Sequence, residues 1–349
     1  MGKRIAMVGS GAIGGYMGAH MVRAGEDVTF IDAWPEHVET MRRDGLSVKG
    51  MEPGYDFTTP VKALHVGDVQ SLMREAPIDI AFISVKSYDT AWATQLILPY
   101  LAEDGVLVSL QNGINEDAIA GVAGWGRTLG CCVGMHGGEM TAAGVVERTT
   151  PLNMTGKPEL LVGEVHGRIT PRAIEIANLL SCAAPASTTS NLWGVRWSKL
   201  IINAMRNGVS AATGLGGKAR DSNDEALWLT LRLGAQAIRV GRAMGLSLEP
   251  IAFDLDAIVR AGDGDAAARE QIKQHISKTM SGRADTQRPS MGQDILKGRR
   301  TETDFINGLV ARRGKEYGVD ASLHEKLNDI IRRVERGQVA PSLELIAGL

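Results

Sequence analysis

Short apolar runs alternate with helical patterns over the first half of the chain. The first run, Arg4–Val8, leads into a glycine-rich turn and a stretch of helical character at Tyr16–Ala24. Runs that are apolar at nearly every position are typical of strands buried on both faces of a parallel sheet. Repeated strand and helix therefore predict a doubly wound parallel sheet. The further predicted strands are Val28–Ile31, Ile78–Val85, Gly105–Leu110 and Thr128–Val133, with an edge strand at Glu159–Val165.

The second half of the chain has a helical pattern. The change follows the polar stretch Ser187–Asn191, and from about Leu192 onward no strand pattern is found. We therefore predict two domains, an α/β domain over residues 1–190 and an all-α domain over residues 191–349, with the active site in the cleft between them. The predicted helices are Trp197–Asn207, Glu225–Met244, Ala266–Met280 and Thr301–Glu316.

A glycine loop joins the first strand to the first helix. Its residues, Gly9-Ser10-Gly11-Ala12-Ile13-Gly14, fit the pattern G-x-G-x-x-G. Gly9 permits a tight turn, Gly11 permits close approach of a pyrophosphate, and Gly14 lets helix and strand pack closely. The N–H groups and the positive dipole end of the following helix favour phosphate there. The loop predicts a Rossmann-type, dinucleotide-binding domain in which all six residues contact the cofactor.

Asp32 ends the second predicted strand, about 20 positions after the loop, where dinucleotide-binding folds carry an acidic residue. A carboxylate there accepts hydrogen bonds from the ribose 2′-hydroxyl of NAD and repels the 2′-phosphate of NADP. No basic side chain follows Asp32 directly, because the next residues are Ala33, Trp34 and Pro35. The sequence therefore favours NAD(H) over NADP(H).

Polar residues also follow two other buried strands. Lys86 comes after Ile78–Val85, and Asn112 comes after Gly105–Leu110. Open α/β sheets bind ligands at the carboxyl ends of their strands, so both side chains are candidates for contact with cofactor or substrate. Asn112 with Gly113 is also an ordinary turn dipeptide, and that structural alternative stays open.

The helix predicted at Trp197–Asn207 has a polar stripe beside an apolar one. The simplest interpretation of the polar stripe is a solvated face. Much of the helix is apolar, however, so Lys199 is expected to be partly desolvated, which suits a lysine to proton transfer. The polar stripe consists of Lys199, Asn203, Arg206 and Asn207.

A third polar cluster lies between Pro289 and Gly308. Thr301 with Asp304 resembles a capping box at the start of the last predicted helix. Glu302 would then lie near a helix N-terminus, where a carboxylate complements the helix dipole. That structural role and a ligand contact are both open for Glu302.

Composition excludes several classes of function. The formal net charge of −2, with no basic excess, argues against nucleic-acid binding. No apolar stretch reaches roughly 18 residues, so a membrane span is not expected. Three cysteines, Cys131, Cys132 and Cys182, have neither disulfide-framework nor metal-ligand spacing, which predicts a cytoplasmic protein without a metal site. The oligomeric state stays open, a homodimer included.

Taken in order, these motifs resemble those of the ketopantoate reductase (2-dehydropantoate 2-reductase) family. They are the glycine loop, Lys86, the QNG of Gln111–Gly113, the SKLIINA around Lys199, and SMGQD…GRRTETDFING. The resemblance covers nearly the whole chain, and the last two motifs are its most specific parts. It implies an oxidoreductase of pantothenate biosynthesis that transfers hydride from NAD(P)H to the keto group of 2-dehydropantoate, a small 2-keto acid.

The resemblance also implies roles for residues. Lys199 would be the general acid that protonates the keto oxygen and stabilises the developing alkoxide. Lys86 would contact cofactor or substrate. The implied catalytic set is Lys199, Asn203 and Glu302, and the implied substrate-binding set is Asn112, Asn203, Asn207, Ser290 and Glu302.

The sequence departs from the family pattern at three places. A basic residue is usual near the position of Asp32, larger aliphatic residues are usual at Gly292 and Thr303, and the segment 266–288 is longer than the family norm. Two alternatives therefore stay open. One is a dehydrogenase of the same architecture that acts on another hydroxy or keto acid, and the other is a non-catalytic NAD-binding sensor.

Overall fold

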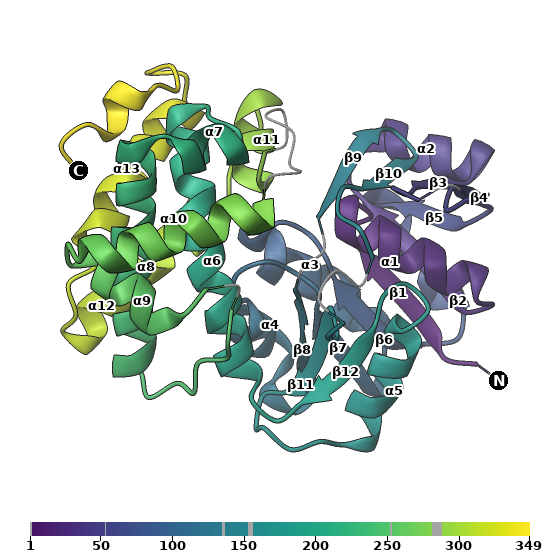
Figure 1. Cartoon of the computed structure of the whole chain (residues 1–349). Coiled ribbons are helices and arrows are strands. Elements are labelled where there is room, and N and C mark those ends of the chain that lie inside the picture. Colours follow the sequence, from purple (N-terminus) through teal and green to yellow (C-terminus); the bar gives the residue numbers. More distant parts are fainter. Residues whose placement is uncertain (1, 53, 135–136, 153–155, 252, 281–287) are drawn as a thin grey trace. The chain divides into compact units, whose positions relative to one another are not determined.

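A computed structural model describes residues 2–52, 54–134, 137–152, 156–251, 253–280 and 288–349. The chain divides into two compact units, Met1–Leu192 and Trp193–Leu349. The first is an α/β unit and the second is helical (Figure 1). The predicted fold class, a Rossmann-type sheet followed by an all-α part, is thereby confirmed.

The described residues of the α/β unit form a sheet of eight strands in the order β12-β11-β8-β7-β6-β1-β2-β5. Neighbouring strands are parallel except β8 and β11, which are antiparallel. The strands are β1 (Arg4–Val8), β2 (Asp27–Asp32), β5 (Lys62–His65), β6 (Ile78–Ile83), β7 (Leu101–Ser109), β8 (Thr128–Val133), β11 (Leu160–Glu164) and β12 (Ala186–Thr189).

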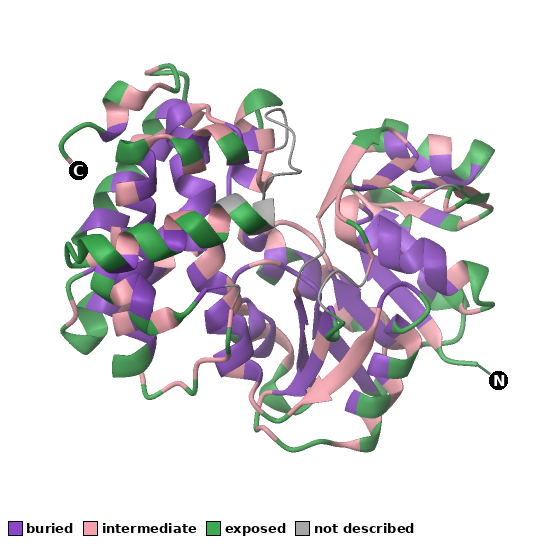
Figure 2. Ribbon diagram, viewed as in Figure 1, coloured by how far each residue is buried: buried purple, intermediate pink, exposed green. Residues whose placement is uncertain are grey.

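Helices cover both faces of this sheet, which explains why its central strands are apolar at nearly every position. In β1, Ile5 and Met7 belong to the core on one face, whereas Ala6 and Val8 belong to the core on the other. Figure 2 shows these central strands as almost wholly buried. The first face is covered by α1 (Ala12–Arg23) and α5 (Pro171–Leu180), the second by α3 (Thr90–Ile97) and α4 (Glu116–Ala123), and α2 (Pro35–Asp44) packs on β5.

A second, four-stranded sheet packs against α1 in the described part of the α/β unit. Gly15 of α1 makes this packing possible, because a Cβ atom there would lie 2.9 Å from Val146 Cγ1. The sequence did not predict this sheet, since its strands are short and mix polar with apolar residues. They are, in order across the sheet, β4 (Phe57–Thr59), β3 (Leu46–Lys49), β10 (Val145–Arg148) and β9 (Gly138–Ala142).

In the described part of the helical unit the longest helix is α6 (Leu192–Thr213). None of the helices in the described parts of the chain is both long and apolar enough to cross a bilayer. The segment 266–288 was expected to be longer than the family norm. Its residues 281–287 lie outside the described residues. The other helices are α7 (Gly217–Ser222), α8 (Asp224–Ala243), α9 (Leu255–Gly262), α10 (Ala266–Met280), α11 (Ser290–Leu296), α12 (Asn307–Tyr317) and α13 (Ser322–Glu335).

Short 3₁₀ helices join several of these elements. They are η1 (Val66–Arg74), η2 (Ser87–Asp89), η3 (Leu98–Tyr100), η4 (Trp125–Arg127), η5 (Thr303–Phe305) and η6 (Leu343–Ile346).

One detail of the predicted sheet was wrong. The strand expected at an edge, β11, lies between β8 and β12, because a further short strand pairs with its outer side. The polar stretch Ser187–Asn191, near which the domain boundary was expected, supplies most of that strand, which the sequence pattern did not predict. Threonine is a good strand former, which is the physical reason for the difference.

The predicted capping box was also wrong. The helix expected from Thr301 begins at Asn307, and its N-cap, Ile306, makes no side-chain capping bond. The Thr301 hydroxyl instead donates to Glu335 at 2.8 Å, and the Asp304 carboxylate accepts from Arg332 at 2.9 Å. These side chains bind another helix rather than their own.

A buried polar network joins α6, α8, α12 and α13. The side-chain nitrogen of Asn307 donates to the carbonyl oxygen of Ala204 (2.8 Å) and to Nδ1 of His324 (3.0 Å). Nε2 of His324 then donates to the carbonyl oxygen of Leu233 at 2.9 Å. This pattern requires a neutral imidazole, and burial lowers the pKa of His324 to about 4.

We predict that the helical unit loses stability as the pH falls from about 6.5 toward 4. In this range the unfolded chain protonates His324, whose ordinary pKa is 6.5, while the folded chain does not. Protonation therefore favours the unfolded chain. A pKa difference of this size between the folded and the unfolded chain lowers the free energy of unfolding by about 3 kcal/mol. Urea unfolding, followed by circular dichroism at several pH values, measures the effect.

The matched comparison is His324→Gln against His275→Gln, which removes an exposed histidine of α10. His324→Gln should lose much of the pH dependence, whereas His275→Gln should keep it. His20 of the α/β unit, whose pKa burial also lowers to about 4, is present in both variants and cancels. An unchanged pH slope in His324→Gln would contradict the prediction.

Candidate functional site

The glycine loop lies at the carboxyl end of β1, and its glycines differ in what surrounds them. Gly9 has a φ of +94°, and a Cβ atom there would lie 2.7 Å from the backbone nitrogen of Val85. A Cβ atom on Gly14 would lie 2.1 Å from the carbonyl oxygen of Gly9. Beside Gly11, by contrast, no atom of the described residues other than its own chain neighbours lies within 4 Å of that position. Gly9 and Gly14 thus serve packing, whereas Gly11 leaves space open in front of the helix.

The N-terminus of α1 has the features of an anion site. Gly11 is its N-cap and makes no side-chain capping bond, and its first turn holds no acidic residue. The first N–H groups of a helix have no partner within the helix and lie at the positive end of its dipole. Together with the space beside Gly11, this end of α1, including the backbone of Ala12 and Ile13, fits the pyrophosphate of a dinucleotide.

Asp32 holds the glycine loop in place. Its carboxylate accepts hydrogen bonds from the backbone N–H of Ser10 (2.8 Å), the hydroxyl of Ser10 (2.9 Å) and the backbone N–H of Trp34 (3.0 Å). From the sequence, Asp32 was expected to contact only the cofactor. A carboxylate has about four acceptor positions, so these bonds leave it able to accept a ribose hydroxyl as well.

His37 is a member of this assembly that the sequence analysis missed. Its Nδ1 accepts from the backbone N–H of Gly144 at 2.8 Å, so its Nε2 carries the proton and donates to the carbonyl oxygen of Ser10 at 3.0 Å. The ring is fully buried and stacks against Trp34. His37 thus joins the loop to the turn between β9 and β10, a long-range contact that leaves no local pattern in the sequence.

The first arginine after Asp32 along the chain is engaged elsewhere. Arg42 of α2 pairs with Asp68 at 2.6 Å and with Glu39 at 2.8 Å, and its Nε donates to the carbonyl oxygen of Ala63. The hydrogen bond to Asp68 and the pairing with Glu39 raise the pKa of Arg42. His65 faces Asp32 across the β2–β5 pair and bonds the carbonyl oxygen of Ala33 at 3.2 Å.

Lys86 and Asn112 lie at the same edge of the sheet as the glycine loop, because β1, β6 and β7 are neighbours. Asn115 connects their segments, since its side-chain nitrogen donates to the carbonyl oxygen of Asn112 (2.7 Å) and to the hydroxyl of Ser87 (3.3 Å). Gln111 donates to the carbonyl oxygen just before Lys86 at 2.8 Å. Gln111 and Asn115 are therefore buried supports for the two predicted site residues.

The polar stripe of α6 is not a solvated face. Asn203 and Asn207 are only 6% and 7% exposed, and Lys199 is half-buried between two buried neighbours. Buried polar groups require hydrogen-bonding partners, and in a half-buried position a charged ammonium interacts more strongly with an oxygen than it would in water.

Two anchors fix the rotation of α6 beside Lys199. The indole nitrogen of Trp197 donates to the carbonyl oxygen of Ala237 in α8 at 2.9 Å. The hydroxyl of Ser198 accepts from the backbone N–H of Glu249 at 2.8 Å. Gly241 of α8 makes room for the indole, because a Cβ atom there would lie 2.4 Å from its nitrogen.

The fourth member of the stripe, Arg206, serves the structure of the unit. It pairs with Asp221 at the end of α7, and Arg220 pairs with the same carboxylate at 2.7 Å. Arg220 also donates to the hydroxyl of Ser210 in α6 at 3.0 Å. Both arginines are buried, so this ion-pair group fastens α7 to α6.

The remaining predicted site residues lie near α11. Ser290 is the first residue of α11 and is half-buried. Glu302 is 3% exposed and is the N-cap of η5, five residues before α12 begins, so it does not complement the dipole of that helix. Among the described residues, no three histidine, cysteine or acidic side chains are grouped to hold a metal ion.

The chain is similar to known reductases over nearly its whole length. The 2-dehydropantoate 2-reductase of Archaeoglobus fulgidus is 28% identical over 344 residues, which cover 96% of this chain and 99% of that protein. A PanE/ApbA family ketopantoate reductase from Ralstonia eutropha has a similar structure, with a TM-score of 0.76, 26% identity and coverage of 96% and 99%.

A D-mandelate dehydrogenase solved with NADH and anilino(oxo)acetate shares the fold, with a TM-score of 0.78, 21% identity and coverage of 96% and 99%. Two family models match the chain. Residues 5–160 match the one described as ketopantoate reductase PanE/ApbA, and residues 191–335 match its C-terminal counterpart. The chain therefore belongs to the ketopantoate reductase PanE/ApbA family.

Proposed function

We propose that the protein is a nicotinamide-dependent reductase that converts 2-dehydropantoate, or a close 2-keto acid, to the 2-hydroxy acid. The observation that carries the proposal is the family match, which includes both the dinucleotide loop of the α/β unit and the polar helix α6 of the helical unit. A curated relative similar over its full length is a 2-dehydropantoate 2-reductase.

A bound nicotinamide supplies the hydride that reaches the keto carbon. Lys199 donates the proton to the keto oxygen, and its charge stabilises the alkoxide that forms there. Asn203 and Glu302 hydrogen-bond the same oxygen or the substrate hydroxyl. Lys199 and Asn203 are held before substrate arrives, because α6 is anchored on both sides of Lys199, by Trp197 and by Arg206.

The substrate carboxylate needs hydrogen-bond donors around it, because a second carboxylate would repel it. Ser290, Asn207 and Asn112 supply hydroxyl and amide donors for it in this proposal. Lys86, at the carboxyl end of β6, adds a positive charge near the cofactor.

NAD(H) is the preferred cofactor in this proposal. Asp32 is a fixed carboxylate at the end of β2, and Arg42 is held by Asp68 and Glu39 away from a ribose phosphate. A carboxylate in this place favours a ribose hydroxyl and repels a phosphate.

We predict that Lys199→Ala lowers kcat at least about 100-fold for 2-dehydropantoate while NADH binding stays near that of the wild type. The physical reason is that the proton donor is lost, whereas the pyrophosphate loop is in the other unit. NADH absorbance measures turnover, and fluorescence titration measures NADH affinity.

Lys218→Ala is the matched control, because it removes an exposed lysine from α7 of the same unit. Near-normal turnover of Lys199→Ala would remove Lys199 from the acid role. A panel of aliphatic and aromatic 2-keto and 3-keto acids accompanies the assay. Turnover of another acid alone would identify a different dehydrogenase, and NADH binding without any turnover would identify a sensor.

We predict that Asp32→Asn weakens NADH binding and reduces the discrimination against NADPH, because it removes the charge and keeps an acceptor for the Ser10 donors. Ser10→Ala, which removes only one hydrogen bond to Asp32, should leave the preference between the two cofactors unchanged. The measurement is the ratio of kcat/KM for NADH and NADPH. A wild-type preference for NADPH would refute the cofactor argument.

We predict that Gly11→Ala weakens NADH binding at least about tenfold with little change in Tm, because its methyl group meets no other segment of the described residues and occupies the space in front of α1. Gly14→Ala should instead lower Tm strongly, since its Cβ atom would collide with the carbonyl oxygen of Gly9. Gly121→Ala, in α4 with open space around it, is the control that should change neither quantity. Unchanged NADH affinity in Gly11→Ala would contradict the placement of the pyrophosphate.

A further inference from the structure

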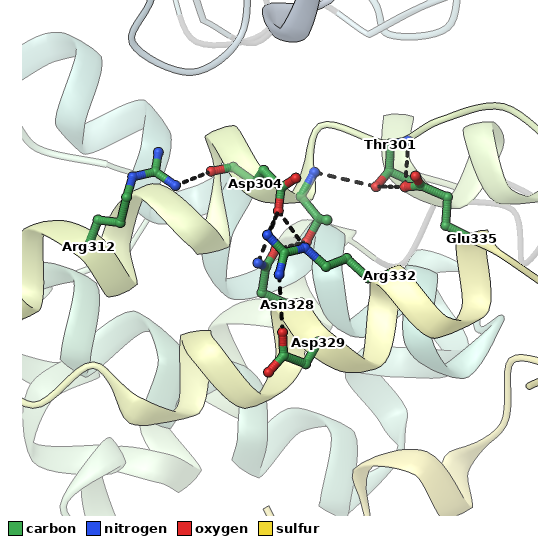
Figure 3. A network of polar contacts seen from close by, with 8 residues as sticks. Thr301, Asp304, Arg312, Asn328, Asp329, Arg332 and Glu335 are labelled. Atoms are coloured by element: carbon green, nitrogen blue, oxygen red, sulfur yellow. Dashed lines mark hydrogen bonds and ion pairs between the residues drawn. The ribbon is translucent and has the colours of Figure 1, made fainter. Parts of the chain in front are cut away.

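The segment that carries Glu302 is tied to α13 on both sides of that residue (Figure 3). Before it, the backbone N–H and the hydroxyl of Thr301 both donate to Oε2 of Glu335, at 2.9 Å and 2.8 Å. After it, the hydroxyl of Thr303 donates to Oδ1 of Asn328 at 2.8 Å. Glu302 is therefore bracketed by two residues that another helix holds.

Asp304 continues the same attachment. Its carboxylate accepts from the amide of Asn328 (3.1 Å) and from Nε of Arg332 (2.9 Å), and its carbonyl oxygen accepts from Arg312 of α12 at 3.1 Å. Asn328, Arg332 and Glu335 follow one another at spacings of four and three residues, so they share one face of α13. This face is a row of polar attachments for the residues around Glu302 (Figure 3).

Glu335 occupies a position that its own helix does not favour. It is the last residue of α13, where the negative end of the helix dipole disfavours a carboxylate. The other charged residues of that last turn, Arg332 and Arg333, have the sign that the dipole favours. The stabilising contact of Glu335 is thus tertiary, and it is made with both donors of Thr301, which is itself buried.

Irregular backbone depends on such contacts more than a helix does. From Gly298 to Glu302 the chain has no regular element, and the first helical turn after it is the three-residue η5. Without the bonds to Thr301, the backbone next to Glu302 loses two hydrogen bonds to α13 on that side. A displacement of about 1 Å in a group that contacts substrate is enough to cost up to about 100-fold in rate.

We propose that Glu335 is a positioning residue, which fixes the place of Glu302 by binding both donors of Thr301. The inference rests on the proposed contact of Glu302 with substrate. Glu335 itself contacts neither substrate nor cofactor in this proposal, so its effect appears in the chemical step and in substrate binding, not in cofactor binding.

The test compares variants of α13 in the full-length protein. Glu335→Ala should lower kcat about tenfold or more, with NADH affinity unchanged. Glu335→Gln keeps an oxygen that can accept both bonds and should recover most of that loss. Glu325→Ala is the matched control, because it removes an exposed glutamate of the same helix, paired with Lys315 at 2.7 Å, and should leave kcat and KM unchanged.

Thr301→Val supplies a second route that does not alter α13. It removes the hydroxyl donor and keeps the backbone donor, so kcat should fall about threefold or more. If Glu335→Ala folds poorly, Thr301→Val still tests whether the contact with Glu335 positions Glu302. Because both substitutions break the same contact, the losses of the double variant Thr301→Val with Glu335→Ala should be smaller than the two single losses combined.

Glu302→Ala separates this inference from the proposed function, because it removes every oxygen that could bind substrate. If Glu302→Ala keeps wild-type turnover, the proposed substrate contact of Glu302 fails, and the positioning role falls with it. If Glu302→Ala is impaired while Glu335→Ala and Thr301→Val turn over like the wild type, only the positioning role is overturned. An equal loss in Glu335→Gln and Glu335→Ala also overturns it, since a shared acceptor oxygen would then not matter.

Discussion

A polar group that is withdrawn from water costs roughly 1 to 3 kcal/mol unless it is hydrogen-bonded, and the helical unit is organised by this constraint on α6. The helix buries polar side chains along most of its length, so neighbouring elements must supply their partners. The backbone N–H of Glu249, before α9, donates to the hydroxyl of Ser198. Two residues of α7 bind the next polar groups of the helix, since Asp221 pairs with Arg206 and Arg220 donates to Ser210. With those groups paired, the rotation of α6 is fixed, and the stretch that contains Lys199 and Asn203 is held rigidly.

The same constraint shapes the glycine loop of the α/β unit. Both backbone groups of the buried Ser10 are satisfied by side chains, the N–H by Asp32 and the carbonyl oxygen by His37. The first N–H groups of α1, by contrast, have no side-chain cap. The loop is therefore held rigidly on its protein side, and the first N–H groups of α1 stay available at the place where a phosphate would bind. The loop would then lose little conformational entropy when a phosphate binds.

Local patterns predicted the regular elements well and the long-range contacts poorly. Thr128–Val133 and Ala266–Met280 have the bounds expected from sequence, because a buried strand and an amphipathic helix each leave a periodic signal. The small sheet was missed, since strands such as Phe57–Thr59 are too short to show a period. Thr301 was misread as a helix cap because its partner, Glu335, lies 34 positions away. His37 was missed for the same reason, since its contact with Gly144 spans 107 positions. The roles of individual site residues remain predictions from the family resemblance.

The two units thus hold their candidate residues by different physical means. Lys86 and Asn112 follow strands of a parallel sheet, whose ladder of backbone hydrogen bonds fixes where each strand ends. Lys199 and Asn203 project from a helix that is locked by side-chain packing and ion pairs. Glu302 has neither kind of support, because it lies on irregular backbone between α11 and η5. Its neighbours are bound instead by side chains of α13, and individual hydrogen bonds of this kind are each worth only about 1 kcal/mol. The placement of Glu302 therefore depends on several such bonds acting together, and three polar residues on one face of α13 make them.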